Sequence, residues 1–67
     1  MLNEDSKFEI ALDLIEFQIG ACLTELEKNK ENKELNGMYK ELIKTREEIY
    51  RGNQNIIEEV IKKARMV

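Results

Sequence analysis

The sequence has no proline, histidine or tryptophan, a single cysteine and only three glycines. Without proline, no residue of fixed φ breaks a helix. One cysteine excludes an intramolecular disulfide, and the lack of histidine argues against a zinc site or a histidine-assisted nucleophile. We therefore expect no catalytic residue, no metal and no cofactor.

Long hydrophobic runs and a surplus of basic charge are also missing. The most apolar stretch, residues 8–23, is interrupted by acidic residues, whereas a membrane span needs about 20 nearly uncharged ones. The net charge is −3, and the only basic cluster, at residues 62–65, suits the end of a helix dipole. Residues 1–7 are acidic where a secretory leader would be basic. We expect a cytoplasmic protein that binds no membrane, nucleic acid or small-molecule substrate.

The chain length predicts a single helical domain over residues 1–67. A chain this short buries only about 60% of its unfolded surface, so a partner would help to stabilise it. Residues 1–28 hold seven acids and two bases, for a charge of −5, and residues 29–67 hold seven acids and nine bases, for +2. This asymmetry favours packing of the two halves on each other.

The first half predicts a helix from about residue 5 to 28 with two apolar flanks. At about 100° per residue, three acids (Glu9, Asp13 and Glu16) fall on one polar strip. The first apolar stripe comprises Phe8, Leu12, Ile15, Ile19, Cys22, Leu23 and Leu26. The second comprises Ile10, Leu14, Phe17 and Ala21. One neighbouring helix cannot cover both flanks.

The second half predicts a turn at about residues 29–32 and a helix over about residues 33–65, with Asn32 as a possible cap. Residues 51–55 (RGNQN) resemble a break. However, the pairs Leu42-Ile43, Ile49-Tyr50 and Ile56-Ile57 follow one another every seven residues across it, which favours one continuous helix.

These elements predict an all-α fold, an antiparallel helical hairpin of two long helices. The end of the second helix and the second flank of the first would be uncovered, so we expect two hairpins to dimerise into a four-helix bundle. The alternative is a monomeric three-helix bundle with a break at residues 51–55.

The dimer predicts a set of interface residues. We expect self-association through Ile10, Leu14, Phe17, Ile56, Ile57, Val60 and Ile61. The apolar stripe of the second helix, a normal buried face, comprises Leu35, Met38, Tyr39, Leu42, Ile43, Ile49, Tyr50, Ile56, Ile57, Val60, Ile61 and Ala64. Arg46 and Asn53 are polar residues within this stripe, where they can set the register of a bundle. Glu16 lies at the level of Arg46 and is its expected ion-pair partner.

The function expected from this inventory is protein–protein interaction. The acids of the first helix line its solvated strip, and Cys22 lies in an apolar stripe as a small buried hydrophobe, so we predict no enzyme. We expect a small regulatory module that self-associates. The alternative is an antitoxin-like or immunity-like neutraliser that binds a basic protein partner.

Overall fold

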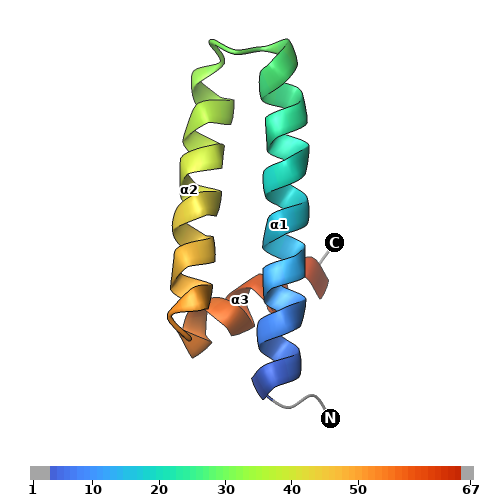
Figure 1. Cartoon of the computed structure of the whole chain (residues 1–67), viewed down its shortest axis with the longest axis vertical. Coiled ribbons are helices and arrows are strands. Elements are labelled where there is room, and N and C mark those ends of the chain that lie inside the picture. The colour runs from blue at the N-terminus through green and yellow to red at the C-terminus, as the bar shows by residue number, and fades with distance from the viewer. Residues whose placement is uncertain (1–3, 66–67) are drawn as a thin grey trace.

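The computed structural model describes residues 4–65, which form three helices and the turns between them (Figure 1). Helix α1 spans Glu4–Lys28, α2 spans Lys33–Tyr50 and α3 spans Gln54–Arg65. The predicted all-α class is confirmed. The prediction of one second helix over residues 33–65 is wrong, and the three-helix alternative fits the structure.

The turn between α1 and α2 is fixed by side-chain amides. Asn32 has an extended backbone, and its side chain accepts a hydrogen bond of 3.1 Å from the backbone N–H of Leu35. This bond satisfies one of the free N–H groups that begin every helix. The Nδ2 atom of Asn36 donates to the carbonyl oxygens of Lys30 and Asn32, at 3.2 and 2.9 Å. The two amides order the turn that reverses the chain between α1 and α2.

The second helix ends where Gly52 takes a left-handed backbone conformation, with φ of 79°. The N–H of Gly52 donates to the carbonyl of Ile49 at 2.9 Å, and the N–H of Asn53 donates to that of Glu48 at 3.1 Å. This pair of bonds is the Schellman motif, which ends helices at glycine. Leaving the helix costs little here because the motif satisfies carbonyls that the end of α2 would otherwise leave unbonded.

Asn53 then starts α3. Its Oδ1 atom accepts a 3.2 Å hydrogen bond from the N–H of Ile56, and its Nδ2 atom donates to a carboxylate oxygen of Glu48 at 3.0 Å. One side chain therefore caps the third helix and ties it to the end of the second. Its role as a register-setting residue of a dimer stays a prediction.

Replacing Asn53 with alanine is expected to lower the free energy of unfolding by about 1 kcal/mol, because the cap of α3 is lost. Urea unfolding followed by circular dichroism measures the change. Asn55→Ala is the matched control, since Asn55 is exposed within α3 and its replacement should change stability by less than about 0.5 kcal/mol. Equal losses in the two variants would contradict a capping role for Asn53.

The core lies at the end of the hairpin opposite the turn, where all three helices meet. Figure 1 shows α3 crossing behind that half of the hairpin, and α3 packs mainly against α1. Buried side chains from each helix form the cluster: Ala11, Ile15, Ile19, Ile49 and Ile57. The overhang expected of a continuous second helix is thus folded back onto the first helix of its own chain.

Candidate functional site

Helix α3 is too short to cover the whole hairpin. It has 12 residues, against 25 in α1 and 18 in α2, and it crosses only the half far from the turn. Beyond it the space between α1 and α2 is an open groove of about 330 Å³. The groove is lined by Phe17, Gln18, Ala21, Cys22, Glu25, Leu35, Met38 and Leu42.

The groove has a buried floor and an exposed apolar edge. Cys22 is 5% exposed, as expected for a buried hydrophobe, and its Sγ atom donates to the carbonyl oxygen of Leu35 at 3.4 Å. Phe17 and Met38 are 78% and 55% exposed on either side of this floor. Single exposed apolar side chains are common on protein surfaces, but large ones gathered at a groove indicate a site that binds another molecule.

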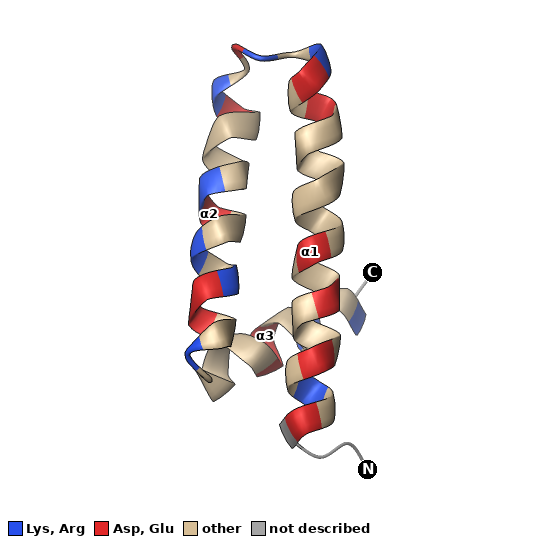
Figure 2. Ribbon diagram, viewed as in Figure 1, with Lys and Arg blue, Asp and Glu red and all other residues tan. Residues whose placement is uncertain are grey.

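The groove coincides with the two uncharged segments of α1 and α2. Residues 17–24 carry no charge between Glu16 and Glu25, in a chain whose residues are 37% charged. Figure 2 shows this segment as an uninterrupted tan band in the half of α1 nearest the turn. Residues 35–39 are likewise uncharged, and the bond between Cys22 and Leu35 places the two segments opposite each other.

The charged residue that lines the groove is acidic. Glu25 lines it from α1. On α2, Glu34 and Glu41 stand one turn before and one turn after Met38, so helix geometry places them along its outer edge. No lysine or arginine of the described residues lines the groove. Its lining is apolar apart from Gln18, Glu25 and the Cys22 thiol.

The residues predicted for self-association are divided by the structure. Ile57 is fully buried in the core of its own chain, and Ile56, Val60 and Ile61 pack against that core. Ile10 and Leu14 are half-buried, and Phe17 is the one largely exposed residue of the set. Self-association through these residues stays a prediction, with Phe17 as its accessible part.

Arg46 lies half-buried on α2, and its Nε atom is buried without a hydrogen-bond partner among the described residues. Glu16 is exposed on α1 and makes no ion pair with it, so the predicted partnership is not formed. A role of Arg46 in setting the register of an assembly stays a prediction.

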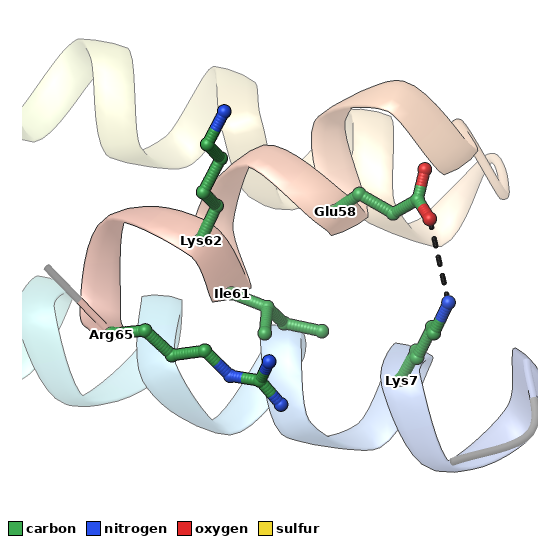
Figure 3. A pocket seen from close by; sticks show the side chains of 5 residues that line it. All are labelled: Lys7, Glu58, Ile61, Lys62 and Arg65. Atoms are coloured by element: carbon green, nitrogen blue, oxygen red, sulfur yellow. Dashed lines mark hydrogen bonds and ion pairs between the residues drawn. The ribbon is translucent and has the colours of Figure 1, made fainter. Parts of the chain in front are cut away.

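A smaller hollow of about 200 Å³ lies where α3 crosses the start of α1 (Figure 3). Ile61 points into it, and the Nζ atom of Lys7 reaches a carboxylate oxygen of Glu58 at 3.4 Å. Both partners are partly solvated, so the ion pair contributes at most about 1 kcal/mol. Lys62 and Arg65 complete the lining and suit the end of the α3 dipole. This hollow is explained by the docking of α3.

The described residues contain no cluster of three or more histidine, cysteine or acidic side chains that would hold a metal ion. No helix within residues 4–65 is long and apolar enough to cross a membrane. Sequence reasoning missed Leu35, Met38 and Leu42 as site residues because it assigned them to a buried stripe. The signal that was available is the uncharged segment at residues 17–24.

Comparison with protein-family models, with curated proteins and with solved structures finds no match to this chain. Its function is therefore inferred from the residues and their arrangement.

Proposed function

We propose that this chain is a small protein–protein interaction module without a catalytic role, and that it acts through the open groove between α1 and α2. The observation that supports the proposal most is the exposure of Phe17 and Met38 beside a buried apolar floor. Aromatic residues and methionine are enriched in the cores of protein interfaces, where a few well-buried anchors carry most of the binding energy. Burying each of the two side chains would contribute roughly 1.5–3 kcal/mol before the costs of association.

The chemistry of the groove supports binding rather than catalysis. Among the described residues that line it, Gln18 and Glu25 have polar side chains, besides the thiol of Cys22. A nucleophile needs a base within hydrogen-bond reach, and the neighbour of the Cys22 thiol is a backbone carbonyl. A groove with an apolar floor and few polar groups is the usual receptor for the apolar face of a helix.

Two kinds of polypeptide can occupy such a groove. A second copy of the chain would make the protein a homodimer, and exposed Phe17 on the second flank of α1 supports this form. A different protein would make it a neutraliser or adaptor, and the glutamates beside the groove support a basic partner. Both forms require that the groove is covered in the cell.

Site-specific photocrosslinking tests that requirement. With a photoreactive amino acid at position 17, we expect a crosslinked adduct with a polypeptide in the cells that naturally make the protein. The matched control places the same group at Asp13, one turn earlier on the solvated strip of α1, where we expect no adduct. An adduct of twice the chain mass identifies a second copy, and another mass identifies a different protein. Equal or absent crosslinking at both positions would overturn the proposal.

A further inference from the structure

We infer that the occupant of the open groove is an amphipathic α-helix of another protein, with lysine or arginine along both edges of its apolar stripe. This inference rests on the function proposed above. It names the chemistry of the partner, which that proposal leaves open. Three features support it: the packing of α3 beside the groove, the glutamates near the groove, and the lack of a free basic helix in this chain within residues 4–65.

The chain itself shows what the space between α1 and α2 accepts. Helix α3 crosses one face of the other half of the hairpin, where Val60 and Lys63 line a small hollow with Ile15 and Thr45. Gln18 and Leu42 line both this hollow and the open groove. The groove therefore begins at the edge of the region that α3 covers. The face of the hairpin on which α3 packs therefore continues into the open groove, which leaves apolar surface for a second helix.

The size of the groove matches a short helical segment. On α1 its lining runs from Phe17 to Glu25, which is roughly 12 Å along the axis at about 1.5 Å per residue. A helix of about two to three turns covers that length, with apolar residues spaced three and four apart to reach the floor. The occupant is therefore a segment with one apolar stripe.

The edges of the groove decide the charge of that segment. Glu25 lines the groove from α1, and helix periodicity puts Glu34 and Glu41 one turn from Met38 on α2. An inserted helix brings the residues that flank its apolar stripe against both edges, so basic residues there are attracted and acidic ones are repelled. Lys63 of α3 lines the adjoining hollow with Gln18 and Leu42, outside the lining of the open groove.

A second copy of this chain fits the groove poorly. In a two-fold dimer the same surfaces meet, so the glutamates at positions 25, 34 and 41 of both copies would face one another. Helix α3 has three basic residues in its last turn, but its apolar face already packs into the core of its own chain, where Ile57 is fully buried. The second flank of α1 adjoins acidic residues. The chain lacks a free helix of the required chemistry within residues 4–65.

Matched peptides test the inference. The probe is an 18-residue peptide with leucines at helical spacing and lysines along both edges of the stripe, labelled for fluorescence anisotropy. A second peptide carries glutamate at every lysine position. We expect the lysine peptide to bind the full chain at least tenfold more tightly than the glutamate peptide, with an affinity that falls as salt rises. Equal binding of the two peptides would overturn the assignment of a basic partner.

Variants of the chain locate the binding site. We expect the double variant Phe17→Ser, Met38→Ser to bind the lysine peptide at least tenfold more weakly. The matched apolar control is Leu23→Ser, because Leu23 is exposed on α1 outside the groove. Glu25→Gln with Glu41→Gln should weaken binding severalfold. Glu9→Gln with Asp13→Asn removes the same two charges from the solvated strip and should leave affinity nearly unchanged. Equal effects of test and control variants would mean that the lysine peptide is attracted to the acidic chain as a whole and does not bind at the groove, which would overturn the inference.

The single cysteine gives an independent readout. Cys22 lies in the floor of the groove, so bound lysine peptide should slow alkylation of its thiol severalfold, with circular dichroism showing that each variant is folded. Unchanged alkylation at saturating peptide would place the peptide elsewhere and overturn the inference. If crosslinking at position 17 gives a dimer and Phe17→Ser abolishes that dimer, the occupant is a second copy of the chain. This result would support the proposed interaction function and overturn the inference of a basic partner protein.

Discussion

Replacing Ile57 with alanine is expected to lower the free energy of unfolding by about 3 kcal/mol. Ile57 is 0% exposed and belongs to the cluster that joins α3 to α1 and α2, so the change removes buried methyl groups and leaves a cavity. A chain this small has only roughly 3–5 kcal/mol of total stability, so the variant should be largely unfolded at room temperature. Urea unfolding followed by circular dichroism at low micromolar concentration measures the loss.

Leu23→Ala is the control for this experiment. It deletes a comparable aliphatic group from a residue that is 43% exposed, and we expect a loss well below that of Ile57→Ala. The comparison also tests the position of α3. On a continuous second helix Ile57 would lie on an overhang beyond α1, where a monomer loses little when the side chain is shortened. A loss below about 1 kcal/mol in a monomeric chain would contradict the packing of α3 into the core.

The hairpin was predictable from the sequence because its signals are local. Residues 28–33 contain no apolar side chain, and Asn32 is followed by the apolar stripe of the next helix. In the structure α1 ends at Lys28, α2 begins at Lys33, and Asn32 is the cap. Local capping chemistry and the loss of apolar periodicity act over a few residues, so they can be found without knowledge of the tertiary packing.

The break after α2 was misjudged because apolar spacing does not distinguish one helix from two that share a core. Ile49 and Ile57 are both fully buried, one on each side of Gly52. Two helices that line the same cluster each present an apolar stripe, and their phases agreed here across the break. The local signal at Gly52 and Asn53 was the better guide, because a Schellman motif and a cap satisfy the backbone groups that a break leaves unbonded.

The groove could be predicted only in part. The two apolar flanks of α1 indicated a surface that one neighbour cannot cover, and Phe17 belongs to that second flank. Which part of the flank stays open depends on the length and crossing direction of α3, which are long-range properties. Ile10 and Leu14 became half-buried, whereas Phe17 stayed exposed. Met38 was assigned to a buried stripe but lies beyond the reach of α3 and is exposed for that reason.

Replacing Gly52 with valine is expected to lower the free energy of unfolding by about 2 kcal/mol. The φ of 79° at this position is one that a β-branched residue rarely adopts. A Cβ atom at Gly52 would meet nothing within 4 Å, so the cost comes from the backbone and not from a steric clash with neighbours. Thermal and urea unfolding measure the loss, and Gly37→Ala provides the comparison.

The sign of the stability change on replacing glycine with alanine distinguishes two helices in residues 33–65 from one continuous helix. Gly37 lies inside α2 with open space around its Cα, so Gly37→Ala should stabilise the chain by up to about 1 kcal/mol. Gly52→Ala should destabilise it by about 1 kcal/mol, because alanine must adopt a left-handed conformation. In a continuous helix both changes would stabilise by a similar amount. Stabilisation by Gly52→Ala would therefore contradict the turn at Gly52 and the packing of α3 against the hairpin. It would also contradict the open groove, which exists because α3 covers only half of the hairpin.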